Sequence, residues 1–132
     1  MKYMLIIAGP EVDQQDQMSP EDMGATMSAW NDYTQSLIEA GAFLSGEGLQ
    51  PSATATTVRH TPGGDRVVSD GPFAETKEHV GGFYLLECAN LDEALDWSKK
   101  MPIQEGNAIE VRPVMDYPEE YQEPETEKAA AS

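Results

Sequence analysis

Charged and imidazole side chains gather between residues 70 and 79, just after a strand-like run of the sequence ends at Ser69. Asp70 stands at this strand end, where partial desolvation would raise its carboxyl pKa toward that of a useful general base. His79 could exchange protons with it, because histidine titrates near neutral pH without help. Each residue has a simpler interpretation: Asp70 can cap its own turn, and His79 can be merely solvated. The chemistry that this pair predicts is proton transfer.

The segment between these two residues adds Glu75 and Lys77, and glycines flank it at positions 71, 81 and 82. Flexible ends would let the segment move as a lid. In that lid Glu75 would be a second catalytic carboxylate, and Lys77 and Phe73 would bind the substrate. The alternative is a solvated helical turn whose local ion pairs contribute about 0.5 kcal/mol or less.

Arg112 lies within an otherwise apolar run, Ala108 to Val114. An arginine in such a strand needs a partner, because burying an unpaired charge is costly. One interpretation is an ion pair with Glu87 or Glu110 at the sheet edge. The other is substrate binding, in which the guanidinium holds a carboxylate of the substrate through two parallel hydrogen bonds.

The sequence lacks the motifs of several common enzyme classes. It has no G-x-G-x-x-G, no Walker-type loop, no C-x-x-C, no H-E-x-x-H and no G-x-S-x-G. One cysteine and two histidines do not favour a zinc site of the usual kind. We therefore expect no metal and no cofactor.

The composition bounds the partners of the chain. Its 132 residues include 24 acids and 8 bases, for a formal net charge of −16. Such a surface repels phosphate backbones and anionic lipids, so we expect neither nucleic-acid binding nor membrane binding. The apolar run from Tyr3 to Ala8 is too short for a signal sequence or a membrane span. With a single cysteine, Cys88, no intrachain disulfide can form, and we predict a cytoplasmic protein.

The first elements that must position these groups are a strand and a long helix. Lys2 to Ala8 is apolar on both faces, as a central strand would be. Ser19 followed by Pro20 marks a helix start, and Gly41 marks its end. The apolar positions of this helix recur at helical spacing and are Met23, Met27, Trp30, Tyr33, Leu37 and Ile38.

Shorter strands follow in the middle and at the end of the chain. Residues 42–45 form a short strand candidate, and residues 54–60 and 66–69 pair as a hairpin. Residues 82–88 and 108–114 are two further apolar strands.

A second helix is predicted between these last two strands. Asn90 caps it, with Glu93 in the capping-box position, and Pro102 stops it. Residues 1–115 then form one α+β domain, and residues 116–132 an acidic tail rich in Pro, Glu and Ala that we expect to be disordered. The inner stripe of the second helix comprises Leu91, Ala94, Leu95, Ser98 and Met101.

The order strand, helix, strand, hairpin, strand, helix, strand predicts a ferredoxin-like fold, an antiparallel sheet with both helices on one face. The other face of the sheet is also apolar in the two central strands and must be covered. We expect a second copy of the chain to cover it, in a homodimer packed sheet to sheet.

Four stretches resemble a known family. They are LSGEGLQPSATATTVR (44–59), DGPFAETKEHVGGFYLLE (70–87), LDEALDWSKKMP (91–102) and AIEVRPV (108–114). Together with the opening MKYMLII they resemble the DGPF branch of the YCII-related proteins over residues 1 to about 115. The resemblance implies a dimeric ferredoxin-like α+β barrel, in agreement with the order of elements.

The resemblance also implies two kinds of function. Some YCII-related proteins look as if they carry a His–Asp pair in a cleft; Asp70 would match the aspartate, but residues 23–27 lack the histidine expected early in the first helix. DGPF-type proteins often occur beside extracytoplasmic-function sigma factors. We thus expect a small-molecule enzyme of the isomerase or lyase type, without a cofactor. The alternative is a ligand-binding or regulatory module associated with such a sigma factor.

Overall fold

The computed structural model describes residues 1–11, 19–72 and 78–121. The tail predicted from residue 116 is described only as far as residue 121, so its disorder stays a prediction. In chain order the elements are β1 (Lys2–Gly9), α1 (Pro20–Glu39), β2 (Phe43–Gly48), the 3-10 helix η1 (Ser52–Thr54), β3 (Thr56–His60), β4 (Arg66–Asp70), β5 (His79–Glu87), α2 (Leu91–Lys99), β6 (Ala108–Pro113) and the 3-10 helix η2 (Glu119–Tyr121).

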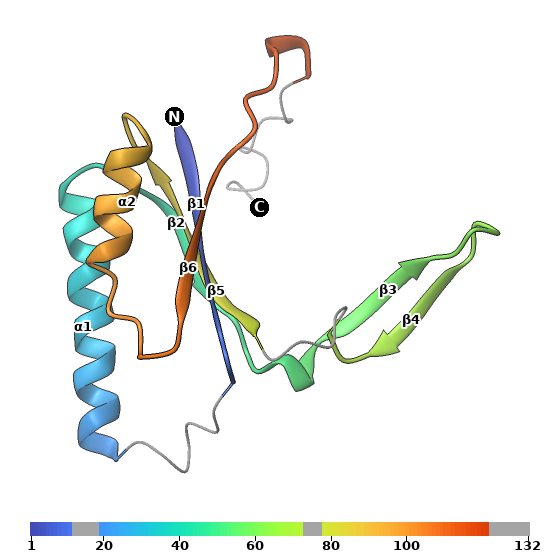
Figure 1. Ribbon diagram of the computed structural model, residues 1–132, viewed down its shortest axis with the longest axis horizontal. Helices are drawn as coiled ribbons and strands as arrows, with labels where there is room; N and C mark the ends of the chain where they lie inside the picture. Colours follow the sequence, from blue (N-terminus) through green and yellow to red (C-terminus); the bar gives the residue numbers. More distant parts are fainter. Residues whose placement is uncertain (12–18, 73–77, 122–132) are drawn as a thin grey trace, which may run out of the picture.

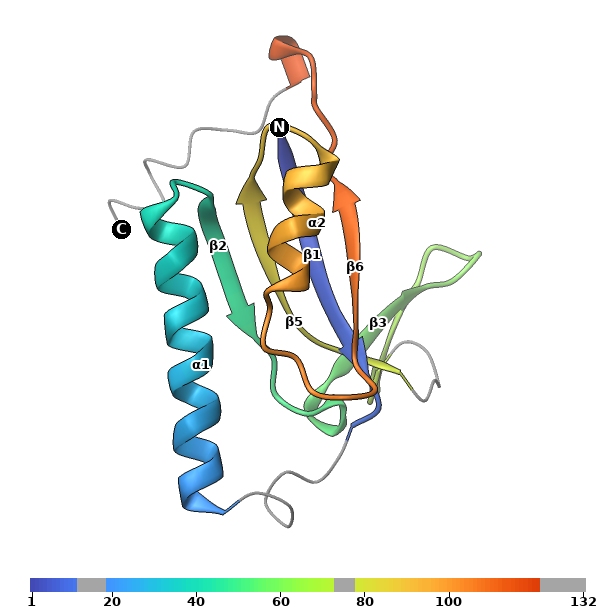
Figure 2. The same ribbon diagram turned by 60° about the vertical axis from the view of Figure 1, so that its left-hand side comes forward.

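Four strands form the main sheet in the order β2-β5-β1-β6, and every neighbouring pair is antiparallel. Both helices pack on the same face of this sheet, as Figures 1 and 2 show from two sides. Each helix connects two strands that are separated in the sheet by a third strand. The predicted α+β ferredoxin-like fold is therefore confirmed.

The helix ends form where the capping residues predict them. The Ser19 hydroxyl accepts a hydrogen bond from the Asp22 N–H at 3.1 Å, and Gly41 ends α1 with a φ of 72°. At α2 the Asn90 side chain accepts the Glu93 N–H at 3.0 Å. The Glu93 carboxylate in turn accepts the N–H of Ala89, one residue before the cap, at 3.0 Å. This is a capping box shifted by one residue.

The core lies between the helices and the sheet. Leu5, Leu37 and Leu86 are fully buried there, and Cys88 is buried as a small apolar residue. Burial raises the pKa of the Cys88 thiol, so the thiol stays protonated near neutral pH. The buried Tyr33 hydroxyl donates to the Trp97 carbonyl at 2.9 Å, which satisfies its polar end.

Four apolar residues that the periodicity places inside are exposed. Met23, Met27 and Ile38 of α1 are 39%, 55% and 50% exposed, and Leu91 in the first turn of α2 is 47% exposed. At Met23 and Met27 the prediction was wrong because α1 outruns the sheet at its N-terminal end. A 20-residue helix is about 30 Å long, whereas the six residues of β2 span about 20 Å. Figure 2 shows α1 continuing past the end of β2. Ile38 follows the buried Leu37 and therefore lies on a different side of the helix, and Leu91 is the first residue of α2.

Strands β3 and β4 form a separate two-stranded ribbon, which confirms the predicted hairpin. In Figure 1 this ribbon projects from the side of the sheet opposite the helices. Every residue of β4 is exposed, including Val67 and Val68. We call residues 56–70 the arm. An isolated two-stranded hairpin is marginally stable in water.

The sheet face away from the helices is apolar in its two central strands. The register pairs Met4 with Leu85 and Ile6 with Phe83 on this face, and all four side chains are partly buried. Arg112 lies beside Met4 in the same row. This confirms that β1 and β5 are apolar on both faces.

Within the described part of the chain, no helix combines the length and hydrophobicity needed to cross a membrane.

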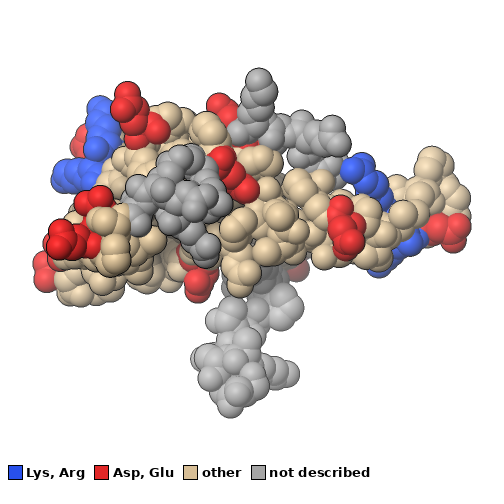
Figure 3. Space-filling view, turned by 90° about the horizontal axis from the view of Figure 1, so that it is seen from below, with Lys and Arg blue, Asp and Glu red and all other residues tan. Residues whose placement is uncertain are grey.

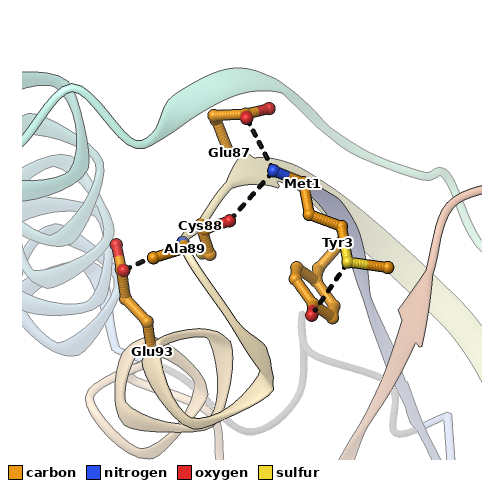
Figure 4. Close-up of polar contacts among 6 residues, drawn as sticks. All are labelled: Met1, Tyr3, Glu87, Cys88, Ala89 and Glu93. Atoms are coloured by element: carbon orange, nitrogen blue, oxygen red, sulfur yellow. Dashed lines mark hydrogen bonds and ion pairs between the residues drawn. The ribbon is translucent and has the colours of Figure 1, made fainter.

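Figure 4 shows how the start of β1 is held. The Met1 ammonium donates to Glu87 Oε1 at 2.8 Å and to the Cys88 carbonyl at 3.1 Å. Both partners of the ion pair are about half exposed, so it contributes at most about 1 kcal/mol. Glu87 is thus engaged at the N-terminus, and Arg112 forms no ion pair with a residue that the structure describes.

Candidate functional site

A cleft opens where α1 runs past the sheet. It consists of two adjoining hollows of about 770 and 500 Å³. Both are lined by Ile7, Met23 and Asn107, so they are neighbours within one cleft. Its walls are the N-terminal half of α1, the adjacent ends of β1, β2 and β5, and the loop that leads into β6. Clefts of this size with a few convergent polar groups are typical ligand sites.

The larger hollow is the polar end of the cleft, and it brings Glu11 and His79 together. Glu11 follows the end of β1, and His79 begins β5 opposite Gly9. The β1–β5 register shifts between Ile7 and Ala8, a β-bulge that re-aims the strand ends. Asn107 lines the same hollow and packs tightly on Gly9, where a Cβ atom would lie 1.9 Å from its Oδ1.

The Glu11 carboxylate is fixed in place by Ser52. It accepts the Ser52 N–H at 2.7 Å and the Ser52 hydroxyl at 3.0 Å. These two hydrogen bonds, first the N–H and then the hydroxyl, hold the pKa of Glu11 below its usual value, and the nearby His79 charge adds to the effect. Glu11 is therefore an ionised carboxylate beside an imidazole.

Ser52→Ala should raise the pKa of Glu11 part of the way toward its ordinary value of 4.5, because one of two hydrogen bonds to the carboxylate is lost. The pKa is lower in the folded state than in the unfolded state. The stability that this contact contributes is therefore present above pH 4.5 and lost as the pH falls through the folded-state pKa. NMR titration of the Glu11 carboxyl measures the shift.

Thr54→Ala is the matched control for this titration. Thr54 lies in the same 3-10 helix as Ser52, and its hydroxyl bonds the Pro51 carbonyl instead of Glu11. It should leave the Glu11 pKa unchanged. An equal Glu11 pKa in Ser52→Ala and in the unsubstituted protein would show that the hydroxyl does not stabilise the carboxylate.

The smaller hollow is the apolar end of the cleft. Trp30 and Tyr84 lie on its wall with their rings nearly parallel, 8° apart, and their centroids separated by 6.2 Å. The Tyr84 hydroxyl shares a 2.7 Å hydrogen bond with Thr34, which fixes the ring. The exposed Met23 and Met27 complete this wall.

The predicted site residues are not all brought to the cleft. His79 lines it, whereas Asp70 is exposed at the end of β4 in the arm and lines neither hollow. Arg112 lies on the opposite face of the sheet and is exposed. Phe73, Glu75 and Lys77 lie outside the described residues. The roles predicted for all these residues stay predictions.

Sequence reasoning missed Glu11, Ser52 and Asn107, and it identified Trp30 only as one of the apolar positions of the first helix. The only signal for Glu11 was its place directly after Gly9-Pro10, at the end of an apolar strand.

Figure 3 shows Lys and Arg side chains gathering toward the two ends of the lower face of the molecule. Among the described residues, no group of three or more His, Cys, Asp or Glu could hold a metal ion.

Comparison with known proteins identifies the family. A family model described as the YCII-related domain matches residues 1–118. The chain is 45% identical over 82 residues to an uncharacterized protein of Rhizobium meliloti (strain 1021); the overlap covers 61% of this chain and 65%, just under two thirds, of that protein's length. The DGPF branch stays a prediction. Because the family model covers nearly the whole chain, the protein belongs to the YCII-related domain family.

Proposed function

We propose that the protein is a small-molecule enzyme that transfers protons without a cofactor in the cleft, with His79 as the acid–base group. The observation that carries this proposal is the meeting of His79 and Glu11 at the polar end of a hollow of about 770 Å³. An imidazole accepts and returns a proton near neutral pH. Isomerisation and elimination both require only such transfers.

The neighbouring groups suit this role. The negative charge of Glu11 stabilises the imidazolium that forms when His79 takes a proton from a carbon acid. Gln104 and Asn107 line the same hollow, and their side-chain amides supply donors for the oxygen on which negative charge develops. Returning the proton to a neighbouring carbon completes an isomerisation.

His79→Asn should lower the rate of proton transfer by about 10²- to 10⁴-fold, the usual contribution of one general base. The assay is exchange of the acidic C–H protons of a cyclic ketone, 2-tetralone, into D₂O, followed by ¹H NMR. Asparagine keeps a polar side chain of similar reach but cannot take the proton. Asp70→Asn is the control, because Asp70 lies in the arm and outside the lining of the cleft.

The three outcomes separate the candidates. Loss of exchange in His79→Asn alone supports the proposal. Loss in Asp70→Asn alone moves the chemistry to Asp70, as the sequence predicts. If the unsubstituted protein does not accelerate exchange above the buffer rate, the enzyme proposal fails for this class of carbon acid.

A regulatory module without catalysis is the second candidate. The observation that favours it is the net charge of −16, which suits a basic protein partner more than an anionic one. The partner implied by the family resemblance is an extracytoplasmic-function sigma factor. A partner of this kind would place the protein in the cytoplasm. Co-purification with that factor, weakened by added salt, would support this candidate; separate elution at low salt would remove it.

We also propose that a second copy of the chain covers the open face of the sheet. The support is the apolar row of Met4, Ile6, Phe83 and Leu85 on that face, since contiguous apolar surface of this kind marks an interface. The arm projects from the same side of the sheet (Figure 1) and would reach along the partner. Sedimentation at micromolar concentration measures the oligomeric state. A dimer would support this proposal, and a monomer would contradict it.

A further inference from the structure

We propose that the cleft binds a flat ring compound that is neutral or positively charged. The ring would lie in the apolar hollow, against the aromatic wall formed by Trp30 of α1 and Tyr84 of β5. Its polar substituent would point toward Glu11. This inference names a ligand class for the cleft of the proposed function, and it rests on that function only for the location of the site.

The apolar hollow is lined by aromatic and methionine side chains. Trp30 and Tyr84 offer two nearly parallel rings, and Met27 is 55% exposed beside them. Aromatic rings bind other rings by stacking or by edge contacts, and methionine side chains adapt to the shape of an apolar ligand. A wall of this composition fits a ring better than a flexible polar chain.

Three glycines form part of the floor of this hollow and place no side chain in it. The register places Gly46, Gly48 and Gly82 on the helix side of β2 and β5, in line with Tyr84. Packing explains two of these glycines, because a Cβ on Gly46 would lie 3.0 Å from the Tyr84 ring and one on Gly82 would lie 2.7 Å from the Glu47 carbonyl.

Packing does not explain Gly48. A Cβ there would meet nothing within 4 Å, and the residue is not among those with a positive φ. Glycine weakens a strand and often marks a site that a ligand approaches closely. A side chain at position 48 would lie in the hollow, whereas glycine leaves that space open to a ring.

The charges around the cleft select against anions. Glu11, Glu47 and Glu105 are among its lining residues, together with the single histidine, His79. No lysine or arginine of the described residues lines either hollow. These carboxylates would repel an anionic ligand, whereas a cation would be attracted and could also lie over the face of Trp30.

Three probes test the ring and the charge separately: tryptamine, which is a cationic indole, indole-3-propionate, which is its anionic counterpart, and n-butylamine, a cation without a ring. Isothermal titration calorimetry on the full chain should give tryptamine a Kd at least about tenfold lower than those of the other two. Equal or tighter binding of either comparison compound overturns the assigned class. So does the absence of tryptamine binding at millimolar concentration.

Gly48→Val tests the location of the ring. It should weaken tryptamine binding by about tenfold or more and leave the melting temperature unchanged or higher, since valine favours strands. Gly24→Ala is the control; Gly24 also has open space around it but lines neither hollow, so binding should stay the same. Unchanged tryptamine affinity in Gly48→Val overturns the proposed location. Binding is read without turnover, so these results stand whether or not proton exchange is found.

Discussion

Gly82→Ala should destabilise the protein by about 1–3 kcal/mol, the usual cost of overpacking. Gly82 is buried, and an added Cβ would lie 2.7 Å from the carbonyl oxygen of Glu47 on the neighbouring strand. That oxygen belongs to the backbone, so β2 and β5 would have to move apart at the floor of the cleft. Urea unfolding followed by circular dichroism measures the change in the free energy of unfolding.

Gly48→Ala is the matched control, because Gly48 is the cross-strand partner of Gly82. Its added Cβ would meet nothing within 4 Å, so the free energy of unfolding should change by less than about 0.5 kcal/mol. Equal destabilisation by the two substitutions would contradict the asymmetric approach of the two strands. If neither substitution destabilised the protein, β2 would be free to shift away from β5.

Leu37→Ala should destabilise the protein by about 2–5 kcal/mol. Leu37 is fully buried between α1 and the sheet, and its truncation leaves a cavity that the neighbouring side chains cannot fill completely. Because a domain of this size is stable by only about 5–15 kcal/mol in total, the substitution removes a large share. Thermal and urea unfolding measure it.

Ile38→Ala, at the next position, separates burial from helix formation. Ile38 is 50% exposed, and alanine is the better helix former, so the cost should stay below about 1 kcal/mol. A cost close to that of Leu37→Ala would show that Ile38 is covered in solution by something other than the residues that the structure describes.

Much of the fold follows from local chemistry that is visible in the sequence. Ser19 with Pro20, Gly41, and Asn90 with Glu93 each satisfy backbone groups at a helix end, and such capping needs no knowledge of the rest of the chain. The alternation of element types then leaves few possible sheet orders. The ferredoxin-like arrangement was predictable for this reason.

The cleft was not predictable, because it depends on lengths and registers that no local pattern contains. Periodicity placed Met23 and Met27 inside, but it does not reveal that the helix is longer than the strands it covers. Glu11 and His79 are far apart in the sequence and meet only through the β1–β5 pairing and its bulge. Sequence reasoning therefore found His79 and paired it with Asp70, which is nearby in the sequence.

Gly48 of β2 pairs with Gly82 of β5. The segment between them is therefore an excursion from the scaffold, which is the four-stranded sheet with its two helices. The chain leaves β2 at Gly48 and re-enters the sheet at His79, which pairs with Gly9 of β1, before it reaches Gly82, the cross-strand partner of Gly48. A tight turn could join Gly48 directly to Gly82. This excursion carries Ser52 and His79, whereas Trp30 and Tyr84 belong to the scaffold. Because lengthening such a connection costs little entropy, the polar end of the cleft can be rebuilt without disturbing the scaffold that holds its apolar end.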